Sequence, residues 1–294
     1  MKTAGVWDPK QWPLYFAASN LDTLDHGKSI LECLLIAVNE LHDKDIAWVA
    51  QCIEAGKKVL IDSGVYWLAT RHAEKHDVSM DVALSLDPTD VDGFDELYDR
   101  YVRLVRELGH RAWGYIEVDQ GGKKNKRKTR AKLERLGFNP IPVYHPINDG
   151  WAYFDELAKK YDRICFGNVV NADAPTRKRL IATAWERRRA YPDLWIHALG
   201  LTPSELTVAY PINSCDSSTW IGPNRWGAHA AKTATTPFSK LDRQFVYKYG
   251  EEADSERSRQ KGVRMCAYDA VMTNRVMRVI ADAECQELGA NLQV

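Results

Sequence analysis

The sequence predicts an α/β fold in which parallel strands alternate with helices. Short apolar runs recur along the 294 residues, and the stretches between them place apolar residues at helical spacing. Three of the runs end in a carboxylate: Asp62, Asp119 and Asp216. Alternation of this kind is typical of right-handed parallel units, and eight runs favour a closed (β/α)8 TIM barrel over an open sheet.

Eight apolar segments are the predicted strands. The run 57–62 is representative, because Val59, Leu60 and Ile61 lead into Asp62 and a turn. Segment 34–38 is ambiguous, since its periodicity fits a buried helix equally well. In chain order the predicted strands are 14–19, 34–38, 57–62, 113–119, 140–145, 163–167, 194–199 and 209–216.

Helix-like stretches separate most of these strands. The clearest is 95–108, whose apolar residues fall on one face. Residues 128–136, 151–160 and 174–191 follow the same spacing. Thr202-Pro203-Ser204-Glu205 predicts a helix start, with Thr202 as the N-cap, proline at the first helical position and glutamate at the third.

The character of the sequence changes beyond Trp220. Glycine, proline and threonine are frequent in 221–237, and 255–288 has the spacing of a long amphipathic helix. We therefore expect a barrel domain over residues 1–230. Residues 231–294 are expected to form a C-terminal helical appendage that packs on the barrel.

The composition narrows the class of protein. Hydrophobic residues make up 45%, mean hydropathy is -0.42, and no apolar run approaches the length of a membrane span. The amino terminus lacks the apolar region of a secretory signal. Six scattered cysteines without a C-x-x-C pair indicate reduced thiols and argue against a structural zinc site. We expect a cytoplasmic protein (host cytoplasm if viral) with no metal, no cofactor and no membrane partner.

The three strand-end carboxylates are the strongest functional signal. The carboxyl ends of barrel strands meet at one face, so Asp62, Asp119 and Asp216 are expected to converge over one substrate. Any one of them has a structural alternative, such as capping a helix or pairing with an arginine. A pair of carboxylates suits displacement at a sugar anomeric carbon, where one attacks and the other moves protons.

Five short motifs resemble, in this order, those of the tRNA-guanine transglycosylases. They are DSGVY at 62–66, YIEVD at 115–119, ICFGN at 164–168, LGLTPSEL at 199–206 and SCDS at 214–217, and the resemblance covers roughly residues 14–227. The family's C-x-C-x-x-C zinc motif is absent, which implies a barrel without a zinc subdomain. Its glycine pair is Gly167-Asn168 here, and Tyr144-His145-Pro146 replaces its Q-G-G turn.

The chain in this trimmed form resembles the phage and bacterial DNA-guanine transglycosylases (the DpdA family), which exchange guanine in DNA for a 7-deazaguanine. The resemblance implies DNA and a free 7-deazaguanine base of the 7-cyano type as partners, with no cofactor. It implies Asp216 as the nucleophile and Asp62 as general acid and base. Asp119 would read guanine. The other expected pocket residues are Ser63, Gly64, His145, Gly167, Asn168 and His197.

The aromatic and histidine assignments have alternatives. Tyr66 or Trp220 is expected to stack on the base, but Trp220 would equally well pin its loop onto the barrel. The alternative for His145 is a purely structural role in fixing a turn. The alternative for His197 is a core residue whose hydrogen bonds are satisfied within the protein.

A basic run follows Asp119 directly and predicts contact with a phosphate backbone. Its residues are Lys123, Lys124, Lys126, Arg127 and Lys128. The alternative is an ordinary solvated helix face.

Other functions remain open from the sequence. The choice of DNA over tRNA rests on resemblance alone. A barrel glycoside hydrolase also uses two carboxylates, and a non-catalytic nucleic-acid-binding subunit would be expected to lack Asp216. A homodimer is compatible with the sequence.

Overall fold

The computed structural model describes residues 2–8, 14–204, 206–207, 210, 212–222, 263–264 and 266–276. Its centre is a curled sheet of eight strands in the order β4-β3-β2-β1-β8-β7-β6-β5, and every paired strand is parallel to its neighbour. The strands are β1 (Leu14–Ala18), β2 (Cys33–Ala37), β3 (Lys58–Asp62), β4 (Gly114–Tyr115), β5 (Val143–Tyr144), β6 (Arg163–Phe166), β7 (Trp195–Ala198) and β8 (Ser214–Ser217).

The chain just after β4 lies beside the chain just before β5. A parallel bridge joins Ile116 to Ile141. The Ile141 N–H donates to the Tyr115 carbonyl at 2.8 Å, and the Glu117 N–H donates to the Ile141 carbonyl at 3.0 Å. The sheet therefore curls until the end of β4 meets the chain that leads into β5.

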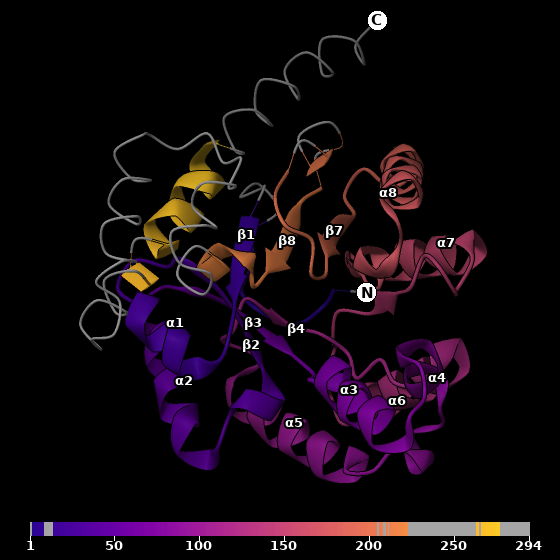
Figure 1. The fold of residues 1–294 in the computed structure, drawn as a ribbon, viewed down its shortest axis with the longest axis horizontal. Helices are drawn as coiled ribbons and strands as arrows, with labels where there is room; N and C mark the ends of the chain where they lie inside the picture. The colour runs from indigo at the N-terminus through magenta and orange to yellow at the C-terminus, as the bar shows by residue number, and fades with distance from the viewer. Residues whose placement is uncertain are drawn as a thin grey trace, which may run out of the picture.

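Helices surround the sheet, with α1 and α2 on one side of the view and α7 and α8 on the other (Figure 1). The helices are α1 (Leu21–Gly27), α2 (Ile46–Glu54), α3 (Val65–His76), α4 (Met80–Ser85), α5 (Phe94–Leu108), α6 (Gly122–Arg135), α7 (Trp151–Lys160) and α8 (Ala174–Arg188). The predicted helix 151–160 is confirmed. The predicted helix 128–136 begins earlier, because Gly121 adopts a left-handed conformation that starts α6 at Gly122.

Several sequence-based boundaries are corrected. The predicted strand 34–38 is confirmed over its helical alternative, since β2 pairs with both β1 and β3, but it begins and ends one residue earlier. The predicted strands 113–119 and 209–216 are longer than β4 and β8. Thr202 is not a helix cap, because its hydroxyl bonds to Ser217 and Thr219 at 3.0 Å each. Ser204 instead accepts from the Leu206 N–H.

Both faces of the sheet are buried, as its apolar strands predict. Leu14 and Phe16 point into the cluster enclosed by the sheet, whereas Tyr15 and Ala17 belong to the cluster between the sheet and the helices. This alternation is the expected consequence of the two-residue period of a strand.

The amino-terminal segment covers one end of the enclosed cluster. Arg163, the first residue of β6, is buried and donates to the Thr3 hydroxyl and to the Ala4 and Trp113 carbonyls. Its guanidinium also lies over the Trp7 ring. Burial lowers the pKa of Arg163 to about 10. Arg163 begins a strand, whereas the acids lie at or beyond the carboxyl ends of strands. The amino-terminal segment therefore covers the opposite end of the sheet from the acids.

A helical segment over residues 266–276 packs on β1 (Figure 1, yellow). Ala267 and Ala270 are buried in the outer cluster. The Asn274 side chain donates to the Tyr15 carbonyl at 3.0 Å and accepts from the Tyr15 N–H. The expected helix 255–288 is thus seen in part, and the rest of it lies outside the described residues.

The described cysteines are all buried and none forms a disulfide. Within the same residues, no helix has both the length and the apolar character required to cross a bilayer.

Candidate active site

Asp62, Asp119 and Asp216 line one cavity of 360 Å³ at the carboxyl ends of the strands. Asp62 is the last residue of β3, Asp216 lies in β8, and Asp119 follows β4. The expected convergence of the three acids is therefore seen in the structure. The cavity is also lined by Leu35, Tyr66, Leu84, His145, Gly167, Asn168, Val170, Asn171, Leu199 and Gly200.

Asp62 is set up to hold a proton near neutral pH. Burial raises the pKa of its carboxyl to about 7, with a smaller contribution to this rise from the charges of Asp119 and Asp216. The Gly64 N–H donates to Oδ2 at 3.2 Å and opposes this shift. A carboxyl poised in this way can give up a proton and take one back.

Asp216 has a different environment, built from donors. Its Oδ1 accepts from the Gly200 N–H at 3.0 Å and lies 3.1 Å from His197 Nε2. These two contacts hold the carboxyl group in place. No hydrogen bond from the described residues reaches Oδ2, which leaves that oxygen for attack on a substrate.

His197 acts on Asp216 from behind the cavity and does not line it. It is buried, and its Nδ1 lies 2.8 Å from Ser214 Oγ. Ser214 already accepts from Trp195 Nε1 at 2.7 Å, so its hydroxyl proton is free to go to Nδ1. Nε2 then carries the ring proton and donates to Asp216. His197 was expected to contact the substrate, and this expectation is corrected. The residue supports Asp216 from the core instead.

Asp119 pairs with His145 across the cavity wall. Asp119 Oδ2 lies 3.0 Å from His145 Nε2, and both side chains are only slightly exposed. Gly167 makes this possible, because a Cβ at that position would lie 2.8 Å from His145 Cδ2. The expected placement of His145 and Gly167 in one pocket is therefore seen.

Asn168 lines the cavity as expected, whereas Ser63 and Gly64 do not. Asn168 donates from Nδ2 to Asn148 Oδ1 at 2.6 Å, and its Oδ1 is buried without a partner. Ser63 is buried behind Asp62. Gly64 adopts a left-handed backbone with φ of 80° that turns the chain into α3. These two residues position Asp62 instead of contacting a ligand.

The two residues expected to stack on the base, Tyr66 and Trp220, lie in different environments. Tyr66 is 61% exposed and lines the cavity. Trp220 is buried, and its Nε1 donates to the Ala18 carbonyl at 3.0 Å. Trp220 therefore pins its loop onto β1, and the expected stacking role remains only for Tyr66.

The basic run forms α6, and one of its members is misassigned. Lys126 is completely buried and forms an ion pair of 2.6 Å with Asp149, so it cannot contact phosphate. Lys123 donates to the Asp149 carbonyl, and Arg127 pairs with Glu156. Lys124 and Lys128 are exposed.

A buried charge network behind the cavity was missed by the sequence analysis. Glu117 accepts from the Val143 N–H at 2.6 Å and lies 3.3 Å from Arg130. Burial raises the pKa of Glu117 to about 7 against the opposing effect of the Arg130 and Lys126 charges. The available signal was the spacing of Lys126, Arg130 and Leu133, the buried face of a helix with few apolar residues.

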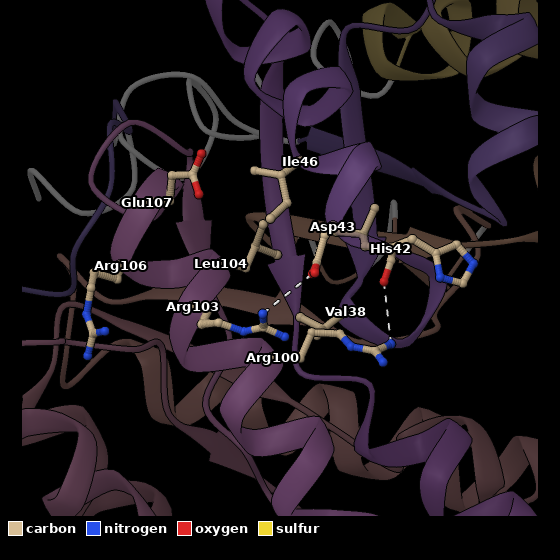
Figure 2. Close-up of a pocket in the computed structure, with 10 residues that line it drawn as sticks. Val38, His42, Asp43, Ile46, Arg100, Arg103, Leu104, Arg106 and Glu107 are labelled. Atoms are coloured by element: carbon tan, nitrogen blue, oxygen red, sulfur yellow. Dashed lines mark hydrogen bonds and ion pairs between the residues drawn. The ribbon is translucent and has the colours of Figure 1, made fainter.

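A second hollow of 290 Å³ lies between the chain after β2 and α5 (Figure 2). Two of its arginines are bound to neighbouring residues. Arg103 forms an ion pair with Asp43 at 3.6 Å, and Arg100 donates to the Leu41 carbonyl. None of the predicted site residues lines this hollow, so the acidic cavity is the candidate site.

No protein family model matches the chain, and no curated protein matches it.

Proposed function

We propose that the chain is a DNA-guanine transglycosylase that exchanges guanine for a 7-deazaguanine base of the 7-cyano type. The observation that carries the proposal is the meeting of Asp62, Asp119 and Asp216 in one cavity, in three different environments. We also interpret the curled sheet as a closed (β/α)8 TIM barrel, because a parallel bridge joins the chain after β4 to the chain before β5.

In the first displacement, Asp216 attacks C1′ of the target deoxyguanosine and forms a glycosyl ester. The bond from C1′ to N9 breaks, its electron pair leaves with guanine, and protonated Asp62 supplies the proton that guanine takes up. A carboxyl with a pKa of about 7 holds this proton at neutral pH. Gly200 and His197 hold Asp216 in its orientation through Oδ1.

In the second displacement, the incoming base replaces guanine. The Asp62 carboxylate takes the N9 proton, N9 attacks C1′, and the bond from C1′ to Asp216 breaks. Asp216 returns as a carboxylate and Asp62 is protonated again, so the site is ready for another turn. Two inversions at C1′ retain the configuration of the sugar.

Asp119 supports selection of the base. Its carboxylate is oriented by His145 and would accept from the N1–H and exocyclic amine that guanine and 7-deazaguanines share. Adenine lacks this donor pair, so it would leave the other Asp119 oxygen without a partner in a confined site. The buried Asn168 Oδ1 offers a further acceptor in the same wall.

The polymer would have to deliver its base into the cavity. A base inside a duplex must be flipped out or be single-stranded already. Tyr66 is exposed and lines the cavity, and it would stack on the base. The exposed part of α6 begins directly after Asp119 and could hold the backbone.

The test is an exchange assay with labelled guanine on DNA and on tRNA, comparing the wild type with Asp216→Asn. Asp193→Asn is the matched control, because Asp193 is exposed and lies just before β7. We expect label in DNA with the wild type and the control, and none with Asp216→Asn. Label only in tRNA would favour the tRNA enzyme. No exchange with either polymer, together with turnover of an aryl glycoside, would favour a glycoside hydrolase. Binding without any turnover would favour a non-catalytic subunit.

A further inference from the structure

We propose that His72, His76 and Asp92 form a zinc-binding site on the outside of the sheet, distinct from the acidic cavity. One ligand atom from each residue lies within 4.8 Å of the other two. Within the part of the chain that the structure describes, this is the group of histidine and carboxylate side chains that meets the spacing of a metal site. The site is independent of the proposed exchange reaction.

Secondary structure brings the ligands together. His72 and His76 are four residues apart on α3 and therefore lie on the same face, one turn from each other. Two histidines at this spacing on a helix are a common metal-binding pair. Their ring centroids are 4.3 Å apart. Asp92 comes from the short connection between η3 (Pro88–Asp90) and α5.

One pair of the ligand atoms already has the spacing of a zinc centre. Bond lengths of about 2.0–2.2 Å in a tetrahedral site place neighbouring ligand atoms about 3.4 Å apart. His76 Nε2 and Asp92 Oδ2 are 3.4 Å apart in the structure. His76 and Asp92 are exposed enough for small rotations to bring them closer to His72.

His72 supplies a second, independent indication. The residue is 9% exposed, and its Nδ1 is buried without a hydrogen-bond partner. A buried polar atom left in this state is unfavourable, because the hydrogen bonds it made to water are not replaced. A metal ion is one partner that would satisfy it. His72 and Asp92 also line a cleft of 660 Å³ between α3 and the start of α5, which gives an ion access from solvent.

The donor set indicates the metal. Two imidazoles and one carboxylate suit Zn²⁺, with water as a fourth ligand. The expectation of no metal considered the cysteines alone, and this group contains none. Lys75 competes with the ion, because its ammonium pairs with the same Asp92 oxygen. Both partners of that pair are more than half exposed, so the pair is weak enough for an ion to displace.

The structural consequence would be a clamp. An ion here would tie the last turn of α3 to the connection before α5. The first turn of α3 carries Tyr66, which lines the acidic cavity. Zinc would therefore fix the helix that leads away from Asp62.

Calorimetric titration of the untagged, metal-free protein with Zn²⁺ tests the proposal, with Co²⁺ absorption as a probe of tetrahedral geometry. We expect one ion per chain and a rise in Tm that depends on zinc concentration. His76→Gln and Asp92→Asn should each weaken binding by at least about tenfold, since loss of a second-shell partner alone costs about 10–100-fold. His72 is left intact, because truncating a buried side chain would itself lower stability.

Lys75→Gln separates ligation from general structure. Removing the competing ammonium frees Asp92, so zinc should bind more tightly than to the wild type. His110→Gln, at an exposed histidine at the end of α5, is the matched control and should bind as the wild type does. Stoichiometric binding that persists in both His76→Gln and Asp92→Asn would overturn the proposal. Absence of saturable zinc binding to the wild type would overturn it as well.

Discussion

Lys126 Nζ lies 2.6 Å from Asp149 Oδ2, and both side chains are almost fully enclosed by protein. The same ammonium donates to the Val143 carbonyl at 3.1 Å, and the same carboxylate oxygen accepts from the His145 N–H at 2.8 Å. One ion pair therefore links α6 to β5 and to the histidine that contacts Asp119.

Lys126→Ala is expected to destabilise the protein by about 3–5 kcal/mol. The substitution leaves the Asp149 carboxylate buried without its cation, and that loss dominates over the loss of the contact itself. Urea unfolding at pH 7 measures the change. Lys124→Ala, on the exposed face of the same helix, is the control and should change stability by less than about 0.5 kcal/mol. Similar stability of the two variants would remove the structural role of Lys126.

Asp216→Asn is expected to lower base exchange by at least about 10⁴-fold while DNA binding stays nearly normal. An amide cannot form the glycosyl ester, but it keeps the size and most contacts of the carboxylate. Single-turnover exchange and a binding titration give the two readouts. A covalent DNA adduct should be trapped on the wild type and be missing from the variant. Near-normal turnover of Asp216→Asn would exclude Asp216 as the nucleophile.

The pKa of Asp62 predicts the pH dependence of guanine release. Release requires the protonated carboxyl, so its single-turnover rate should fall about tenfold per pH unit above about pH 7. Quenched measurements from pH 5 to 9 would show this descending limb. A rate that stays level to pH 9 would mean that another group donates the proton.

The same pKa predicts a gain of stability when Asp62 is replaced. A carboxyl whose pKa is higher in the folded than in the unfolded protein favours folding at low pH, and this contribution is lost as pH rises from about 4 through about 7. Asp62→Asn should therefore be more stable than the wild type at pH 8, by about 1–3 kcal/mol after allowance for partial exposure. The gain should shrink at pH 5. Urea midpoints at the two pH values measure it, with Asp193→Asn unchanged as control.

The exposed residues of α6 are expected to hold a phosphate backbone. Neutralising Lys123, Lys124, Arg127 and Lys128, with Lys126 left intact for stability, should weaken DNA binding across all sequences. The salt dependence should flatten by roughly one unit of log–log slope per lost contact. Selectivity for guanine should survive, because it belongs to Asp119 and the cavity. Unchanged affinity and slope would return this face to an ordinary solvated surface.

Loss of tRNA binding with DNA binding intact in the same variant would instead favour a tRNA substrate.

The strand ends were predictable because the signal is local. A run such as Val59-Leu60-Ile61 is buried on both faces of a parallel sheet, so neither its periodicity nor its burial depends on distant contacts. Once parallel strands are assumed, the carboxylates after them must meet at one end. The local pattern of the strands is therefore enough to predict that Asp62, Asp119 and Asp216 lie together.

The misassigned residues depend on which way a side chain faces. Lys126 belongs to a helix so rich in bases that its buried face consists partly of lysine and arginine stems, which a charge count cannot reveal. Trp220 bonds to a residue of β1 that lies 202 positions away in the sequence. His197 bonds to Asp216 on the neighbouring strand β8. Only tertiary packing decides between their two possible roles.

The hydrogen bonds between Asn274 and Tyr15 have a consequence for folding during translation. The two residues are separated by 259 positions, yet the amide of one completes the backbone hydrogen bonds of the other. β1 also pairs with β8, about two hundred residues later in the chain. The first strand to leave the ribosome is therefore among the last to acquire all its partners. The apolar surface of β1 therefore stays incompletely buried through most of translation. Nascent chains of this kind are most prone to aggregate during that period.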